Sequence, residues 1–185
     1  MFAPDLLTIK SILKKQIMKK IFLAICIMAS SAVFAQQGNN QIGVGAEVGL
    51  PTGDFGDAAK TGFGGYAKGL FGIGEAGQIT FTTGYTSYKF KGGIDANWSI
   101  IPLLAGYRHN FSGFYAEPQI GYGILGAKAD GGESDSEGLF TWAVGFGYVI
   151  NNVDFGARYQ SGHKDGSTIS LVGIHVGYNF SLGGK

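Results

Sequence analysis

Seven ionisable side chains fall on one polar face of the strands that this sequence predicts. Carboxylates, guanidinium groups, an ammonium group and an imidazole gathered together could pass ions, or they could neutralise one another. Buried charges require partners, and the positive and negative groups here are nearly balanced. We therefore expect a structural charge network rather than a gate. The seven residues are Glu47, Lys68, Arg108, Glu117, Asp154, Arg158 and His175.

The segment from Trp98 to Tyr122 indicates how strands would bring two of these charges together. Its residues alternate between apolar and small or polar types, which is typical of a strand with two different environments. If Ser112-Gly113 is a two-residue turn, counting back from it places Arg108 directly opposite Glu117. The same register gathers the apolar residues on the other face, and a slip of one residue would reverse both faces.

Eight alternating segments follow one another after residue 40, with no helical periodicity between them. Pro118 lies inside one of them and lacks a donor for the strand ladder, so we expect a bulge or a local edge there. The predicted strands are Gln41–Leu50, Gly62–Ile73, Gln78–Tyr88, Trp98–Phe111, Phe114–Tyr122, Leu139–Ile150, Val153–Gln160 and Thr168–Phe180.

The predicted connections alternate between long and short. An even number of strands, joined by short turns at one end and longer loops at the other, is typical of transmembrane β-barrels. We predict an all-β fold, an eight-stranded antiparallel up-and-down transmembrane β-barrel. The long connections are 51–61, 89–96, 127–138 and 161–167, and the short ones are 74–77, 112–113 and 151–152.

The two faces of the strands differ in a way that favours a membrane barrel over a soluble one. One face is bulky and apolar, and the other is mostly glycine, threonine and serine with the charges. Glycine has no evident use on a solvated exterior, but inside a narrow barrel it makes room for large neighbours. Leu70, Leu104, Leu125 and Leu171 break this pattern, and we expect them at strand ends or in apolar layers of the lumen. The outward candidates for interfacial aromatic girdles are Tyr85, Tyr107, Trp142, Tyr148, Tyr159 and Tyr178.

Residues 18–35 read as a cleavable signal peptide. Met18-Lys19-Lys20 precedes an apolar run too short to span a membrane, and the run ends in the cleavage pattern Val33-Phe34-Ala35. Residues 1–17 are then an upstream extension, with either Met1 or Met18 as the start, and 36–185 form the barrel domain. The one cysteine, Cys26, precedes the cleavage site, so the exported chain has no disulfide.

The chain resembles the small outer-membrane β-barrels of Gram-negative bacteria, the OmpA/OmpX-type and porin-like barrel domains. The resemblance is carried by the signal peptide, by 101–108 and 113–118, and by the aromatic-ended last strand. It implies location in the cell outer membrane, a monomer in contact with membrane lipid and lipopolysaccharide, and insertion by the barrel assembly machinery. The family usually ends at an aromatic assembly signal, whereas here Tyr178 or Phe180 would act ahead of a short tail.

Two other chemistries, metal binding and lipid A hydrolysis, have candidate residues in the sequence. The acidic loop Asp130 to Glu137 could bind calcium or meet the divalent ions that bridge lipopolysaccharide. It lacks the ordered spacing of a calcium loop, so we expect a solvated loop and no metal site. A lipid A hydrolase would need a serine and a histidine in triad geometry, and no such spacing is recognisable. The residues considered for it are His109, His163, His175, Ser161 and Ser167.

We therefore predict a barrel with a structural or surface-interaction role, no enzymatic activity and no cofactor. A narrow porin-like channel for small solutes or apolar molecules and a lipid A-modifying barrel enzyme are the alternatives. Low, nearly balanced charge argues against a nucleic-acid partner.

Overall fold

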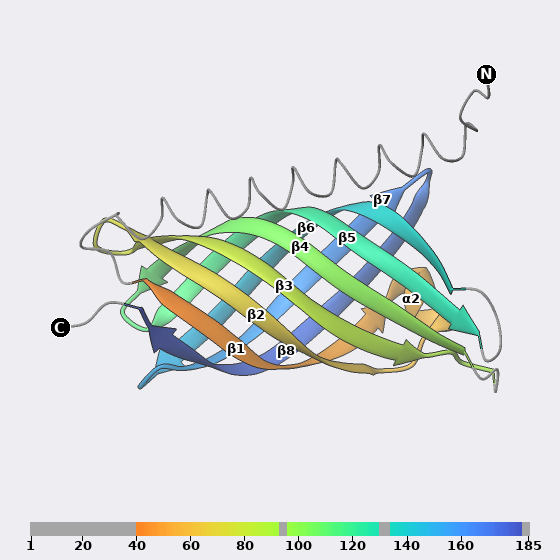
Figure 1. The fold of residues 1–185 in the computed structure, drawn as a ribbon, viewed down its shortest axis with the longest axis horizontal. Coiled ribbons are helices and arrows are strands. Elements are labelled where there is room, and N and C mark those ends of the chain that lie inside the picture. Colours follow the sequence, from red (N-terminus) through yellow and green to blue (C-terminus); the bar gives the residue numbers. More distant parts are fainter. Residues whose placement is uncertain (1–39, 93–95, 130–133, 183–185) are drawn as a thin grey trace, which may run out of the picture. The chain divides into compact units, whose positions relative to one another are not determined.

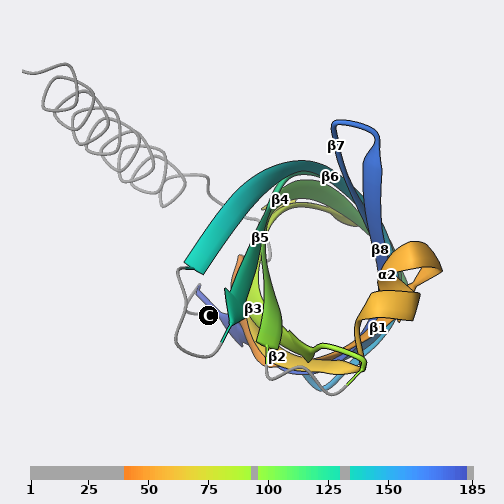
Figure 2. The same ribbon diagram turned by 90° about the vertical axis from the view of Figure 1, so that its right-hand side faces the viewer.

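A computed structural model describes residues 40–92, 96–129 and 134–182, and these residues form one closed barrel. Its antiparallel strands follow chain order, and the last pairs with the first (Figures 1 and 2). The prediction of an eight-stranded up-and-down barrel is confirmed. The strands are β1 Gln41–Thr52, β2 Gly62–Ile73, β3 Gly77–Lys89, β4 Ala96–Phe111, β5 Phe114–Ala129, β6 Ser134–Ile150, β7 Val153–Lys164 and β8 Ser167–Ser181.

The hairpin of β4 and β5 has the register that the sequence predicts. Phe111 pairs with Phe114 across the Ser112-Gly113 turn, and Ala105 pairs with Ile120. Both turn residues have positive φ, 54° and 103°, as a tight two-residue hairpin turn requires.

Pro118 interrupts the ladder between β4 and β5 without shifting it. Regular pairing stops at Gly106↔Gln119 and resumes at His109↔Ala116, which is the same register on both sides. On its other side Pro118 pairs normally with Val144 of β6. Of the two expectations, the bulge is wrong, because a bulge would add a residue to one strand and change the register. The interrupted ladder between β4 and β5 corresponds to the expected local edge.

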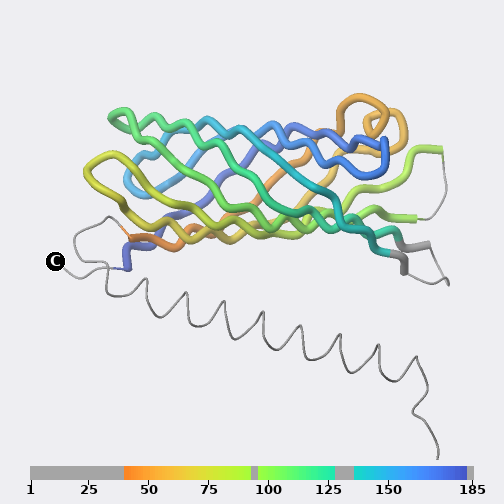
Figure 3. The backbone as a smooth tube through the Cα atoms, turned by 90° about the horizontal axis from the view of Figure 1, so that it is seen from above, coloured from red at the N-terminus to blue at the C-terminus, as the bar shows by residue number. Residues whose placement is uncertain are grey.

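The connections divide the barrel into two ends. The turns at 74–76, 112–113 and 151–152 lie at one end with the start of β1 and the end of β8, and we call this the turn end. The opposite, helix end carries α2, Gly53–Ala58 (Figure 3). No described helix is long and apolar enough to cross a membrane.

Two of the predicted long loops are partly wrong. Strands β7 and β8 pair as far as Lys164↔Ser167, so the loop expected at 161–167 is a two-residue turn. Its residues Asp165 and Gly166 have φ of 46° and 82°, and an Asp-Gly pair suits such a turn. Residues 134–137 of the expected acidic loop belong to β6, and 130–133 lie outside the described residues. Residues 1–35, with the predicted extension and signal peptide, also lie outside them.

The predicted loop 51–61 contains α2, which lies beside β1 and β8 at the helix end and contributes Phe55 to the buried apolar cluster there. Phe55 of this helix is only 5% exposed and lies edge-on to Tyr88, with ring centroids 5.4 Å apart. Leu125 and Leu171, two of the inward-facing leucines, belong to the same cluster, so an apolar layer fills this end of the lumen. The buried cluster comprises Phe55, Ala59, Tyr88, Ile100, Leu125, Leu139 and Leu171.

The outer face of the strands is apolar over much of its area. Phe63, Phe114 and Phe146 are 68%, 64% and 61% exposed, whereas the charged residues on the alternate positions are buried. Large exposed apolar surfaces on a single domain indicate contact with another apolar phase or partner.

Candidate functional site

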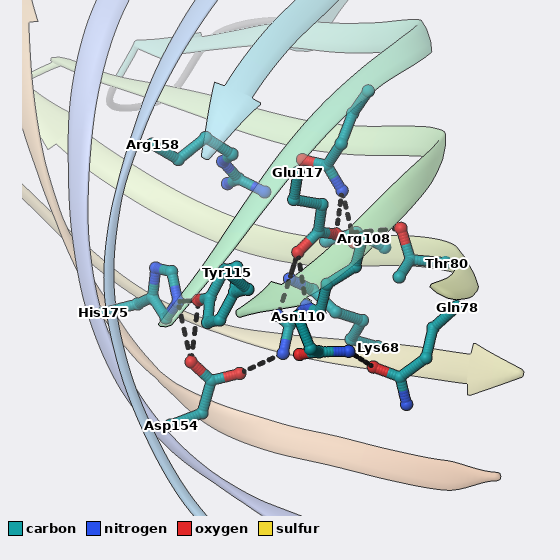
Figure 4. A network of polar contacts seen from close by, with 12 residues as sticks. Lys68, Gln78, Thr80, Arg108, Asn110, Tyr115, Glu117, Asp154, Arg158 and His175 are labelled. Carbon is teal, nitrogen blue, oxygen red and sulfur yellow. Dashed lines mark hydrogen bonds and ion pairs between the residues drawn. The ribbon is translucent and has the colours of Figure 1, made fainter. Parts of the chain in front are cut away.

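Glu117 lies at the centre of a polar network inside the barrel (Figure 4). Its Oε2 accepts hydrogen bonds from Lys68 Nζ at 2.8 Å and from Arg108 Nη2 at 2.9 Å. Its Oε1 accepts from Thr80 at 2.8 Å and from Gln119 at 2.9 Å. Four donors, one each from β2, β3, β4 and β5, therefore surround one carboxylate that is 1% exposed.

Arg108 extends the network towards β7. Its Nη1 donates to Asp154 Oδ2 at 2.9 Å, so the guanidinium bridges two carboxylates. The guanidinium carbon also lies 3.6 Å from the centre of the Tyr115 ring, a cation–π contact. The Tyr115 hydroxyl donates to Asp154 Oδ1 at 2.7 Å and lies 3.1 Å from His175 Nε2.

Glu47 and Arg158 form a second buried ion pair on the opposite wall. Arg158 Nη2 donates to both carboxylate oxygens, at 2.8 Å and 3.1 Å. A residue of β1 is thereby tied to one of β7 across the strand between them. All seven side chains singled out from the sequence thus lie inside the barrel, in contacts that join them into two clusters.

Glycines on the lumen side make room for these side chains. A Cβ atom at Gly156 would lie 2.6 Å from both Tyr115 Oη and His175 Cε1, and one at Gly147 would lie 2.4 Å from Tyr115 Cζ. The alternation of glycine with bulky residues therefore follows from the crowding of the lumen. A cavity of only about 10 Å³ remains between the two charge clusters, about the space that one water needs.

Sequence reasoning missed three members of the network: Thr80, Tyr115 and Gln119. The alternation of the strands already places each of them on the inward face, and this was the one sequence feature that could have marked them as members of the network. Hydroxyl and amide groups carry no charge to be balanced, so nothing in the sequence marks them as partners of Glu117 or Asp154.

The structure brings together one of the serine–histidine pairs considered for a hydrolase. Ser161 Oγ lies 3.1 Å from His163 Nε2, and His163 Nδ1 lies 3.0 Å from Thr168 Oγ1, on the outer face near the helix end. The Trp142 indole N–H donates to the same Nε2 at 3.2 Å. Because Ser161 is only 2% exposed and its base is shared with an indole, this pair is closed to a substrate.

The other candidate residues lie apart. His109 lies on the outer face of β4, 3.0 Å from the Tyr107 hydroxyl, while His175 is buried in the lumen. Tyr178 and Phe180 face outward near the turn end with their rings 4.8 Å apart. Among the described residues, no cluster of three or more His, Cys, Asp or Glu side chains is placed to hold a metal ion.

No protein-family model and no curated protein matches the sequence. Solved structures do match, and the three that follow each align over 78% of this chain. The attachment invasion locus protein Ail of Yersinia pestis aligns over 100% of its chain with a TM-score of 0.60 and 18% identity. Neisserial surface protein A aligns over 97% of its chain with a TM-score of 0.58 and 19% identity.

The N-terminal β-barrel domain of Pseudomonas aeruginosa OprF aligns over 100% of its chain, with a TM-score of 0.52 and 16% identity. At these identities the likeness concerns the fold. The chain therefore has the fold of the small eight-stranded outer-membrane β-barrels of Gram-negative bacteria.

Proposed function

We propose that this protein is an integral outer-membrane β-barrel with a closed lumen and a structural or surface-interaction role. The observation that carries the proposal is the combination of an apolar outer face with a lumen filled by paired charges. In lipid, a closed barrel satisfies its backbone hydrogen bonds internally and exposes only side chains. Glu117 and Arg108, each 1% exposed, occupy the middle of that lumen.

Several features support an exported protein that faces the cell exterior. Residues 18–35 have the pattern of a signal peptide with cleavage near Ala35. Two structural neighbours are an attachment invasion locus protein and a protein named as a surface protein. We propose contact with membrane lipid and lipopolysaccharide, a monomeric barrel, and insertion by the barrel assembly machinery through Tyr178 or Phe180.

The lumen argues against the channel alternative. A conducting pore needs a continuous wet path, whereas eight strands enclose an interior just wide enough for side chains. Here charged groups pair across that interior, and the apolar layer with Phe55 covers them at the helix end. Passage of a solute would require breaking these buried ion pairs.

Planar-bilayer recording tests the closed lumen. We expect no conductance steps from the reconstituted wild-type barrel. The triple variant Phe55→Ala/Arg108→Ala/Glu117→Ala serves as the control, because it removes side chains from both the apolar layer and the charge network, and it should admit ions. Steady conductance from the wild type would support the porin-like alternative instead.

A second assay tests the absence of hydrolase activity. We expect a fluorophosphonate probe to leave the folded barrel unlabelled, because Ser161 is buried beneath its neighbours. We also expect the lipid A profile of cells to be the same with wild type and Ser161→Ala. Labelling of the wild type that is lost in Ser161→Ala would support the enzyme alternative.

A further inference from the structure

Two lysines face each other at the helix end, Lys89 as the last residue of β3 and Lys60 just before β2. Ala59 and Phe90 form an isolated antiparallel bridge, and Lys60 N donates to Lys89 O at 2.8 Å. This register places Lys60 directly opposite Lys89. Side chains opposite each other across antiparallel backbones lie about 4.5–5.5 Å apart at Cβ, and like charges there repel.

The two lysines point away from the lumen. Their chain neighbours Ala59 and Tyr88 are 2% and 1% exposed and belong to the apolar cluster inside the barrel. Successive residues of extended backbone point to opposite faces, so Lys60 and Lys89 lie on the outer face, and both are exposed.

No carboxylate compensates this pair within the described part of the chain. Asp54 and Asp57 of the nearby α2 form no ion pair with either lysine, and neither does any other described acidic side chain. Lys91 lies two residues beyond Lys89, but its ammonium group donates to the Gly56 carbonyl. An exposed pair of facing ammonium groups is therefore left without a counter-charge of its own.

The surface below the pair is aromatic and apolar. Phe63 of β2 lies three residues after Lys60 and is 68% exposed. Tyr85 of β3 lies four residues before Lys89 and is 54% exposed. Aromatic side chains below and lysines above are arranged as at a membrane interface, where the ring meets acyl chains and the ammonium group reaches the headgroups.

From this geometry we propose that Lys60 and Lys89 together bind a phosphate of a membrane-lipid headgroup in the outer leaflet, with Phe63 and Tyr85 against its acyl chains. This inference rests on the proposed membrane location. Each lysine near an anionic lipid surface contributes about 1 kcal/mol, so two correspond to a preference of roughly thirtyfold for a phosphorylated over a zwitterionic lipid.

The experiment uses the folded full-length exported chain in zwitterionic detergent, with diphosphoryl lipid A as the probe. Native mass spectrometry measures how much lipid A, or phosphatidylcholine, stays bound as each is titrated. We expect Lys60→Gln/Lys89→Gln to lose lipid A affinity by on the order of tenfold or more. Lys164→Gln is the matched control, because Lys164 already pairs with Glu137 at 3.2 Å, and it should bind like the wild type.

Two further arms separate the possible failures. Inorganic phosphate added in excess should displace little lipid A if the acyl chains contribute, and complete displacement would overturn the lipid as the ligand. Unchanged affinity in the double variant, or an equal loss in Lys164→Gln, would also overturn the inference. Failure of the chain to insert into phosphatidylcholine vesicles would contradict both the proposed function and this inference. Insertion without any preference for lipid A would contradict this inference alone.

Discussion

Lys68 and Arg108 share a single oxygen atom of Glu117: the ammonium nitrogen lies 2.8 Å and the guanidinium Nη2 2.9 Å from Oε2. Two cations on one carboxylate leave an excess positive charge at this point. Asp154, 2.9 Å from the other arm of Arg108, supplies the balancing carboxylate. The network is therefore neutral only as a unit, which makes its members interdependent.

Replacing Glu117 by Gln should destabilise the barrel strongly, because Lys68 loses its counter-charge and Arg108 loses one of two. Breaking a buried ion pair from one side costs about 3–5 kcal/mol. Urea unfolding in micelles measures this loss. Glu137→Gln is the control: its pair with Lys164 is exposed, so the cost is about 0–1 kcal/mol.

The double variant Lys68→Met/Glu117→Gln should recover much of that loss, because it removes one positive and one negative charge together. Arg108 then keeps Asp154, and Arg158 keeps Glu47. Equal stability of Glu117→Gln and Glu137→Gln would contradict the account of the lumen as a network that needs its charges balanced.

Gly147→Ala should destabilise the barrel through Tyr115. The added Cβ would lie 2.4 Å from the Tyr115 ring and 2.5 Å from the Phe155 carbonyl oxygen, so backbone and ring must both move. Overpacking of this kind costs about 1–3 kcal/mol. Gly138→Ala is the control, because its nearest atoms are 3.8 Å away, and it should be neutral. Thermal unfolding of both variants compares them, and equal midpoints would refute the crowding argument.

Phe55→Ala should loosen α2 and expose the apolar layer at the helix end. The Phe55 ring lies 6.4 Å from that of Trp98, so fluorescence of Trp98 in a Trp142→Phe background should shift to longer wavelength. Loss of a buried Phe costs about 3 kcal/mol. Asp54→Ala, an exposed change on the same helix, should leave the spectrum unchanged. An unshifted spectrum in Phe55→Ala would contradict the packing of α2 onto the barrel end.

The orientation in the membrane has its own test. Once the residues before the cleavage site are removed, the chain has no cysteine, so labelling of a single introduced cysteine reports the accessibility of that position alone. On intact cells an impermeant maleimide should label Asp57→Cys at the helix end and leave Glu75→Cys at the turn end unlabelled. Both should react after permeabilisation, which is the control. The reverse pattern on intact cells would invert the proposed orientation.

The register of the barrel could be predicted because period-two alternation and tight turns constrain it independently. The turn at Ser112-Gly113 and the apolar face of β4 and β5 demand the same pairing, and the structure has it. The inward charges follow from the same alternation, so their place in the lumen was predictable. The same register predicted that Arg108 lies opposite Glu117, and the two form an ion pair. The remaining partners were not predictable, because they depend on how far each side chain reaches across the lumen.

The helix end was harder to predict for two physical reasons. Helix α2 is one short element held by tertiary packing of Phe55, and six residues give no periodicity to detect. The second difficulty is the turn between β7 and β8. Asp165-Gly166 is a strong turn signal, but the polar residues Ser161 to Lys164 before it resemble a loop. They lie on strands where the apolar outer face ends, so polarity there marks the edge of that face and not the end of pairing.

The most direct test of the central claim, a closed barrel in the outer membrane, is heat-modifiability of the outer-membrane fraction. The same sample is run unheated and boiled on an SDS gel. We predict an unheated band that migrates faster than the boiled one, in the outer-membrane fraction. A single band, unaffected by heating and found in the soluble periplasmic fraction, would contradict the account.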